Sequence, residues 1–403
     1  MADFTEQDAR HMQRALALAL RGQGRVEPNP MVGCVLVAEG RVVGEGRHRR
    51  FGGPHAEIEA LRVAGSRARG ATCLVTLEPC CHVGKTGPCT TALIQAGIAR
   101  VIVAMHDPFP PVRGRGIRTL RDAGMAVESG LLEAQAAALN APYLKRLDEG
   151  RPWVILKWAQ SLDGRIATRT GDSQWISGPA SRRRGQRLRG RVDAVVVGVG
   201  TVLADDPLLT CRDAPARRTA RRVVLDPHLR MPERCRLIGT CGDAPTVIVT
   251  TPLKKRTPKA HRLQKRGAIL MGIRTTRAGF DLGQLLDKLG QAGMTNILVE
   301  GGGETLGRFL DERLADEAYV FVAPLLIGGR EAVPALAGLG PATLDGRVFV
   351  KDVRIAKSGP DRMYHLLLDR VGAAGKADGG YNATKGRRNR GKGPNGARLK
   401  AGR

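Results

Sequence analysis

Short apolar runs rich in β-branched residues alternate with helix-forming segments along most of this chain, and this alternation limits its fold more than any other feature. The first series predicts strands over residues 31–37, 41–45, 73–77 and 100–105. Predicted helices begin near Thr5 and cover residues 55–63, 90–97, 117–123 and 133–146. Strands that alternate with helices are typical of α/β folds, so we expect an α/β sandwich domain over residues 1–147.

A second series of the same kind starts near Pro152. It predicts strands over residues 154–160, 194–199, 222–225, 246–250, 297–300 and 318–322. Predicted helices cover residues 179–189, 281–291 and 304–314. We therefore expect a second α/β domain over residues 148–370. Residues 371–403 are mostly Gly, Lys, Arg and Asn with few apolar side chains, which predicts a disordered basic tail.

The chain is strongly basic, with a formal net charge of +27. The tail contains nine Lys or Arg and one Asp, so it supplies +8 and leaves +19 on the rest of the chain. A basic surface attracts anions such as phosphorylated metabolites, NADPH or nucleic acid. The alternative is a general preference for arginine on a solvated surface, which implies no ligand.

The sequence contains no apolar run near the roughly 18 residues that a membrane span needs. It opens on polar and acidic residues, so we expect no signal peptide, no membrane and a cytoplasmic location. Cysteines in that reducing compartment bind metal or lie buried instead of forming disulfides. The eight cysteines are Cys34, Cys73, Cys80, Cys81, Cys89, Cys211, Cys235 and Cys241.

One histidine, one glutamate and two cysteines form the pattern with the clearest chemistry. His55 and Glu57 fall in the first turn of a predicted helix that starts near Pro54, and we expect Cys80 and Cys89 at the starts of two adjacent helices. Three nitrogen and sulfur ligands hold Zn²⁺ and leave a fourth position for water, whose pKa falls toward about 7. The pattern therefore predicts a zinc-dependent hydrolytic deaminase in which Glu57 transfers protons.

Three nearby residues allow more than one interpretation. Cys81 and His82 are alternative ligands, but a side chain next to a ligand tends to point away from it, so we expect both in a loop. Asn29 lies between two prolines, where its amide either binds the edge of a pyrimidine ring or simply stabilises a turn.

Four short motifs in the first part of the chain are distinctive: Pro28-Asn29-Pro30, Val32-Gly33-Cys34, Pro54-His55-Ala56-Glu57 and Thr76-Leu77-Glu78-Pro79-Cys80. Eight residues then separate Cys80 from Cys89. Together these features resemble the bifunctional deaminase–reductase family of riboflavin biosynthesis, which has this long spacing where nucleoside and nucleic-acid deaminases have two residues. Cys81 in place of serine and Gly87 in place of proline depart from the family pattern. The resemblance implies a cytidine-deaminase-like α/β/α sandwich, with zinc on His55, Cys80 and Cys89 and proton transfer by Glu57.

Three polar or glycine-rich segments follow predicted strands of the second domain, at residues 157–176, 198–207 and 299–307. Glycines at a strand-to-helix turn let the backbone approach a phosphate, although a plain tight turn has the same composition. The last segment lacks the dinucleotide-binding fingerprint, since the sixth position from Gly301 is Leu306 and not glycine. These segments resemble the second half of the same family, whose reductase has a dihydrofolate-reductase-like α/β fold and uses NADPH.

The resemblance also implies binding residues in the second domain. Those for NADPH are Ala159, Trp175, Thr201, Asp205, Gly302, Gly303, Glu304, Thr305, Leu306 and Gly307. Those for the substrate are Asn29 in the first domain and Ser173, Arg189, Leu209, Arg212 and Glu300 in the second. Arg189 and Arg212 are suited to hold the ribose phosphate, because a guanidinium binds phosphate through two hydrogen bonds. The sequence indicates no proton donor for the reduction.

The resemblance implies a two-step enzyme of riboflavin biosynthesis. Zinc hydroxide deaminates 2,5-diamino-6-(5-phosphoribosylamino)pyrimidin-4(3H)-one at C2, and NADPH then reduces the ribosyl group of the product to ribityl. We expect a homo-oligomer, either a dimer or a tetramer.

Two other functions remain open. A nucleic-acid base deaminase with an accessory domain would suit the basic tail, but an aromatic content of 3% provides few rings for base stacking. A zinc-stabilised scaffold with an inactive second domain is the other alternative. Weak binding of RNA by residues 376–403 is a separate hypothesis, against that of an inert extension.

Overall fold

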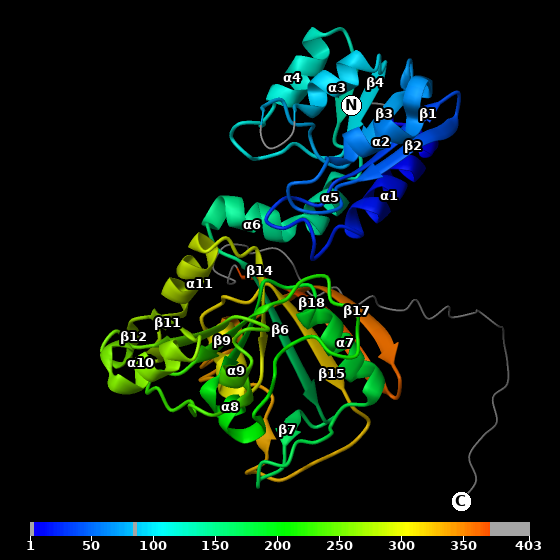
Figure 1. Cartoon of the computed structure of the whole chain (residues 1–403). Helices are drawn as coiled ribbons and strands as arrows, with labels where there is room; N and C mark the ends of the chain where they lie inside the picture. The colour runs from blue at the N-terminus through cyan, green and yellow to red at the C-terminus, as the bar shows by residue number, and fades with distance from the viewer. Residues whose placement is uncertain (1–3, 84–86, 371–403) are drawn as a thin grey trace, which may run out of the picture.

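The computed structural model describes residues 4–83 and 87–370. Two α/β domains follow one another along the chain and meet near α6 (Ala141–Glu149) (Figure 1). The predicted disordered tail, residues 371–403, lies outside the described residues. No helix among the described residues is both long and apolar enough to cross a membrane.

The first domain is built on a five-stranded sheet with the order β2-β1-β3-β4-β5. Its strands are β1 (Gly33–Ala38), β2 (Arg41–Arg47), β3 (Thr72–Val75), β4 (Arg100–Val103) and β5 (Ala126–Ser129). β1 pairs antiparallel with β2 and β3, whereas β3, β4 and β5 run parallel. The four predicted strands are confirmed, each within a few residues of its expected bounds.

Helices cover both faces of this sheet. They are α1 (Glu6–Leu20), α2 (Ala56–Ala64), the 3-10 turn η1 (Gly65–Ala68), α3 (Cys89–Gln95), α4 (Arg115–Asp122), α5 (Glu133–Leu139) and α6. Buried apolar residues of α2, α3 and α4 pack on one face of the sheet, and those of α1 and α5 pack on the other. The predicted α/β/α sandwich is therefore confirmed. α1 begins where expected, because Thr5 and Asp8 form a reciprocal capping box.

The prediction of one helix over residues 133–146 is wrong, because the chain forms two helices there with Asn140 between them. The Asn140 side chain accepts a hydrogen bond from the backbone nitrogen of Met31 at 2.8 Å and donates one to the oxygen of Met31 at 3.0 Å. These long-range bonds fix the break between α5 and α6.

The second domain is built on a nine-stranded sheet with the order β11-β10-β9-β8-β14-β6-β15-β18-β17. Its strands are β6 (Trp153–Gln160), β8 (Ala194–Gly198), β9 (Arg221–Leu225), β10 (Thr246–Thr250), β11 (Ile269–Gly272), β14 (Asn296–Glu300), β15 (Glu317–Val322), β17 (Val350–Ser358) and β18 (Asp361–Leu368). Short strands β7 (Arg165–Ala167), β12 (Thr275–Thr276), β13 (Gly279–Phe280) and β16 (Val333–Pro334) pair outside it. The six predicted strands are confirmed, whereas the antiparallel hairpin β17–β18 was not predicted.

Helices again cover both faces of the sheet. The helical segments are α7 (Pro179–Arg189), α8 (Val199–Asp205), α9 (Arg236–Gly239), η2 (Lys254–Arg256), α10 (Pro258–Lys265), α11 (Leu282–Gln291), α12 (Gly303–Asp311) and η3 (Leu344–Gly346). Apolar residues of α11 and α12 belong to one core, and those of α7 to α10 belong to a second core on the opposite face. All three helices expected in this domain are confirmed.

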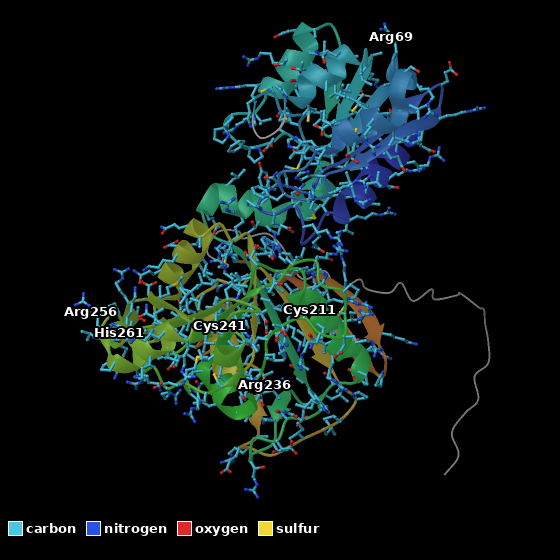
Figure 2. All side chains as sticks on the ribbon, in the orientation of Figure 1. Arg69, Cys211, Arg236, Cys241, Arg256 and His261 are labelled. Atoms are coloured by element: carbon cyan, nitrogen blue, oxygen red, sulfur yellow. The ribbon has the colours of Figure 1, made fainter. Side chains whose placement is uncertain are left out.

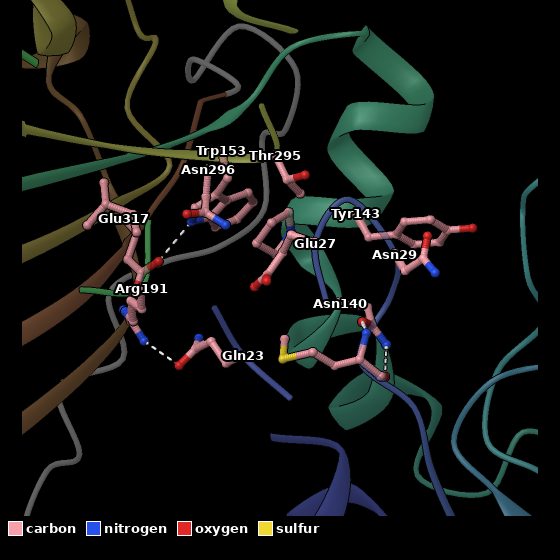
Figure 3. Close-up of a pocket in the computed structure, with 13 residues that line it drawn as sticks. Gln23, Glu27, Asn29, Asn140, Tyr143, Trp153, Arg191, Thr295, Asn296 and Glu317 are labelled. Carbon is pink, nitrogen blue, oxygen red and sulfur yellow. Dashed lines mark hydrogen bonds between the residues drawn. The ribbon is translucent and has the colours of Figure 1, made fainter. Parts of the chain in front are cut away.

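The two domains contact each other through polar groups (Figure 3). Gln23 of the first domain accepts a hydrogen bond from Arg191 of the second at 2.7 Å, and its backbone oxygen accepts one from Arg217 at 2.7 Å. Gly24 has φ +76, and a Cβ there would lie 3.0 Å from the backbone of Arg191. This close approach requires glycine and sets how the domains meet.

Candidate active sites

Three side chains of the first domain meet at one point, as the spacing of the sequence motif predicts. His55 Nδ1 lies 3.5 Å from Cys80 Sγ and 3.3 Å from Cys89 Sγ, and the three ligand atoms all lie within 4.8 Å of one another. Cys89 is the first residue of α3, as expected. His55 is the N-cap of α2 and not part of its first turn, because its backbone is extended. Cys80 lies in a loop and not at a helix start, so that expectation is wrong.

The geometry of this cluster fits zinc. Tetrahedral zinc with bonds of about 2.0 Å to nitrogen and 2.3 Å to sulfur separates neighbouring ligand atoms by roughly 3.3–3.8 Å. The two distances from His55 fall in this range. Hydrogen bonds from Cys89 and His55 lower the pKa of the Cys80 thiol to about 4, which favours the thiolate that binds metal.

Glu57 lies in the first turn of α2 beside the cluster and is 3% exposed. Burial, reinforced by the charge of Cys80, raises the pKa of its carboxyl to about 7. Its Oε2 atom has no hydrogen-bond partner among the described residues. A carboxyl group with this pKa can both accept and release a proton near neutral pH.

A cavity of about 340 Å³ opens over these residues. Asn29 lines it and donates from Nδ2 to His48 Nε2 at 3.2 Å, if His48 Nδ1 carries the proton and donates to the oxygen of Pro54 at 3.0 Å. Burial lowers the pKa of His48, which favours the neutral ring, in which one nitrogen can accept a hydrogen bond. This arrangement leaves Asn29 Oδ1 available to a ligand in the cavity.

The sequence motifs gave no sign of several residues around this cavity. His48 packs edge-on against the ring of His55 at 5.4 Å between centroids, and Phe109 and Tyr143 line the cavity from distant segments. None of them belongs to a local motif, so only the fold brings them together. Cys81 approaches the oxygen of Pro111 at 3.6 Å and His82 packs on Phe109, and neither belongs to the three-atom cluster.

A second group of charged side chains lies on the sheet of the second domain. Arg189 Nη2 lies 2.5 Å from Glu300 Oε2, and Arg189 Nε also donates to the same carboxylate. Lys157 lies on β6, opposite Glu300 of β14. Burial lowers the pKa of the Lys157 ammonium, against the opposing effect of Glu300. Sequence reasoning missed Lys157, because its neighbours come from other strands and helices.

This ion pair changes the expectation for Arg189. Its guanidinium is occupied by Glu300 on two nitrogens, so it is not a free clamp for phosphate in this state. Arg212 is exposed, and its backbone nitrogen is bonded to the side chain of Gln186 at 2.8 Å. Leu209 is 1% exposed and therefore has almost no surface for the substrate contact that was expected. Ser173 is partly exposed in the segment that follows β7.

The glycine segment after β14 has one open position. Gly301 has φ +106, and a Cβ there would lie 2.5 Å from Thr201 Oγ1, whereas a Cβ on Gly302 would meet nothing within 4 Å. Gly302 is the N-cap of α12, where backbone N–H groups attract phosphate. A Cβ on Gly303 or Gly307 would collide with backbone atoms 2.4 and 2.2 Å away, so these two glycines serve packing.

The other residues expected to bind NADPH differ in exposure, and Thr201 lies beside Gly301. Leu306 is 0% exposed and offers no surface to a ligand, which contradicts a direct contact in this state. Trp175 is 68% exposed, with the Arg182 guanidinium 4.5 Å from its ring. Five further residues are exposed or partly exposed: Ala159, Thr201, Asp205, Glu304 and Thr305. The open glycine and the exposed indole ring fit a dinucleotide.

Comparisons with known proteins match both domains. The family model described as the cytidine and deoxycytidylate deaminase zinc-binding region matches residues 5–105, and the model of the RibD C-terminal domain matches residues 152–364. The riboflavin biosynthesis protein RibD of Aquifex aeolicus is 42% identical over 356 residues, which cover 88% of this chain and 97% of that protein. RibD of Escherichia coli is 42% identical over 369 residues, covering 90% and 99%.

Solved structures agree with this match over the same length. RibD of Acinetobacter baumannii is similar with a TM-score of 0.80 and 36% identity, covering 90% of this chain and 99% of that one. The diaminohydroxyphosphoribosylaminopyrimidine deaminase/5-amino-6-(5-phosphoribosylamino)uracil reductase of Thermotoga maritima has a TM-score of 0.78 and 33% identity, covering 90% and 98%. This chain therefore belongs to the RibD family of bifunctional riboflavin-biosynthesis enzymes, in which a zinc-binding, cytidine-deaminase-like domain precedes a dihydrofolate-reductase-like reductase domain that uses NADPH.

Proposed function

We propose that this chain catalyses two consecutive steps of riboflavin biosynthesis. The first is the hydrolytic deamination of 2,5-diamino-6-(5-phosphoribosylamino)pyrimidin-4(3H)-one at C2, and the second is the NADPH-dependent reduction of the ribosyl group of the product. The observation that carries the proposal is the cluster of His55, Cys80 and Cys89 beside the buried carboxyl of Glu57, whose Oε2 atom has no hydrogen-bond partner among the described residues. We assign residues 1–147 to the deaminase and residues 148–370 to the reductase, with the boundary near the end of α6 and just before the short connection to β6.

In the deaminase site we propose that His55, Cys80 and Cys89 hold the zinc ion. Zinc, when bound, supplies a water molecule of lowered pKa at neutral pH. Glu57 would accept one proton from this water on Oε2 and pass it to the ring nitrogen, and would then carry the second proton, from the new C2 hydroxyl group, to the amino group that leaves as ammonia. Asn29, held by His48, offers Oδ1 to an N–H group at the edge of the pyrimidine. The buried position of Glu57 excludes bulk water from this transfer.

In the reductase site we propose that the Gly302 backbone at the start of α12 holds a phosphate of NADPH, with Trp175, Ala159, Thr201 and Asp205 around it. NADPH supplies the hydride. Lys157 is the candidate proton donor, because burial lowers the pKa of its ammonium and so makes proton release easier.

Glu300 and Arg189 keep Lys157 in place and form the polar side of the substrate position. Ser173 and Arg212, which are at least partly exposed, remain proposed substrate contacts. The exposed Arg212 is better placed than the paired Arg189 to bind the ribose phosphate.

We further propose a cytoplasmic homo-oligomer. β17 is the outer strand of the nine-stranded sheet, with Val353 49% exposed and Ile355 61% exposed. A long edge strand with exposed apolar side chains is suited to pair with a second copy of the chain.

One set of assays tests both activities. The protein is analysed for zinc and then assayed for ammonia release and NADPH oxidation with the diaminopyrimidine substrate. Glu57→Gln should keep its zinc and lose ammonia release, yet reduce the deaminated intermediate, supplied directly, at the rate of the unaltered protein. Cys81→Ser is the matched control and should retain both activities. A Glu57→Gln protein that still releases ammonia would contradict the deaminase assignment.

A further inference from the structure

An arginine-lined hollow of about 670 Å³ opens where the two domains meet beside α2. We call it the arginine groove. Its lining residues include one carboxylate, Glu59, and six arginines from both domains: Arg25, Arg49, Arg50, Arg62, Arg217 and Arg218. The loop that contains Arg50 and Pro54 separates the arginine groove from the deaminase cavity.

The positive charge of the groove is only partly balanced. Glu59 pairs with Arg49 at 3.0 Å and with Arg62 at 3.6 Å, so a single carboxylate serves two guanidinium groups. Arg218 pairs with Asp193 and lies 3.8 Å from Glu27.

Three guanidinium groups are left without a carboxylate. Among the described residues, Arg25 and Arg50 have no ion-pair partner, and Arg217 donates only to the backbone oxygen of Gln23. Burial and then repulsion from Arg49, Arg21 and Arg25 lower the pKa of the neighbouring Arg47. The groove therefore concentrates like charges that the protein itself leaves uncompensated.

We propose that the arginine groove binds a small ligand with a chain of phosphate groups, of the triphosphate class. A guanidinium group binds phosphate through two parallel hydrogen bonds, and two such groups satisfy one phosphate. The uncompensated groups, together with Arg49 and Arg62, exceed what a single phosphate needs. The volume falls within the range of small-molecule sites, roughly 300–1,000 Å³.

The bound anion would also connect the two domains. Arg25 and Arg50 belong to the first domain, whereas Arg217 belongs to the second and donates to the backbone oxygen of Gln23 in the first. An anion that pairs with both sides removes the repulsion between them. Binding therefore stabilises the junction, and the melting temperature should rise with ligand concentration.

The probe is inorganic tripolyphosphate, titrated into the full-length zinc-loaded protein by calorimetry. Zinc content is measured before and after, so that metal removal is not mistaken for binding. Arg50→Ala and Arg217→Ala should each weaken binding about tenfold, as expected for the loss of one charged hydrogen-bonding partner. ATP and GTP at the same concentration test whether a nucleoside triphosphate is the source of the triphosphate group, and both should compete.

Arg69→Ala and Arg256→Ala are matched controls, because both arginines are exposed and lie away from the junction, Arg69 at the top of the first domain and Arg256 at the left edge of the second (Figure 2). They should bind tripolyphosphate within twofold of the unaltered protein. Equal losses in control and groove variants would overturn the proposal, as would the absence of binding. Tighter binding of single-stranded RNA, increasing with its length, would also overturn it in favour of a general polyanion surface.

Discussion

Lys145 and Asp316 form a buried ion pair between α6 and the second domain. Lys145 Nζ lies 2.5 Å from Asp316 Oδ2, and the side chains are 4% and 2% exposed. Asp316 also accepts hydrogen bonds from the backbone nitrogen of Val154 at 2.7 Å and from Arg370 at 3.3 Å. Lys145 Nζ also lies over the ring of Trp153, 6.0 Å from its centroid. The two partners are therefore supported unequally.

This inequality predicts different costs for the two single substitutions. Asp316→Asn leaves a buried ammonium without the carboxylate bonded to it, which should lower the free energy of unfolding by about 3–5 kcal/mol. Lys145→Met leaves a carboxylate that keeps Arg370 and Val154, so the loss should be about 1.5–3 kcal/mol, the value of one charged hydrogen bond.

The double variant tests the reasoning more sharply than either single change. Burial raises the pKa of Asp316 and lowers the pKa of Lys145, so each group pays a desolvation penalty when it is ionised. Removing both charges removes both penalties. Lys145→Met combined with Asp316→Asn should therefore cost less than the sum of the single changes, by about 0.5–3 kcal/mol.

Urea unfolding followed by tryptophan fluorescence measures these losses, because all three tryptophans, Trp153, Trp158 and Trp175, lie in the second domain. The melting temperature of Asp316→Asn should fall by about 6–20 °C, at about 2–4 °C per kcal/mol. Asp345→Asn is the control, since that carboxylate is 96% exposed and its pair with Arg347 should matter little. An Asp316→Asn cost below about 1 kcal/mol, or strictly additive changes, would refute the reasoning.

Three other outcomes follow from the two sites. Glu57→Gln should lower the rate of ammonia release by about 10²–10⁴-fold with zinc content unchanged, measured with the pyrimidine substrate. Gly301→Ala should lower the melting temperature and weaken NADPH binding, because the φ of +106 and the 2.5 Å approach of a Cβ to Thr201 exclude a side chain. Gly302→Ala should fold normally and raise only the KM for NADPH, because a Cβ there meets nothing within 4 Å. Removal of zinc by a chelator should abolish ammonia release but leave the rate of NADPH oxidation unchanged when the deaminated intermediate is supplied directly. An equal loss of both activities would contradict two independent sites.

Local sequence patterns predicted the elements that depend on local physics. Inner strands such as β1, β8 and β10 are nearly continuous apolar runs because both of their faces are buried, and α1 begins at a capping box that the sequence spells out. The His55, Cys80 and Cys89 cluster was predictable as well, since each ligand is part of a short motif next to a sheet edge.

Long-range contacts decided what the sequence did not reveal. The break between α5 and α6 depends on Asn140 binding Met31, 109 positions away, and the pairing of Arg189 depends on Glu300, 111 positions away. β17 was missed because most of its residues are exposed, so it lacks the apolar alternation of a half-buried strand. Lys157 opens the first of the polar segments noted in the second domain, but its altered pKa exists only once β6 and β14 pair.

The position of the two sites also bears on how the intermediate moves between them. The deaminase cavity adjoins the junction, whereas β6 runs from Trp153 at the junction away toward β7, and Gly302 lies beyond the far end of β14 (Figure 1). The cavity within the junction, lined by Asn29 and Tyr143 on one side and Trp153 on the other, holds about 40 Å³. That is room for about one or two water molecules at roughly 30 Å³ each, and far too little for a phosphorylated pyrimidine nucleotide. Since this cavity is too small for the intermediate, it offers the product no path between the sites, and we expect that joining the two domains in one chain acts by raising the local concentration of the second site.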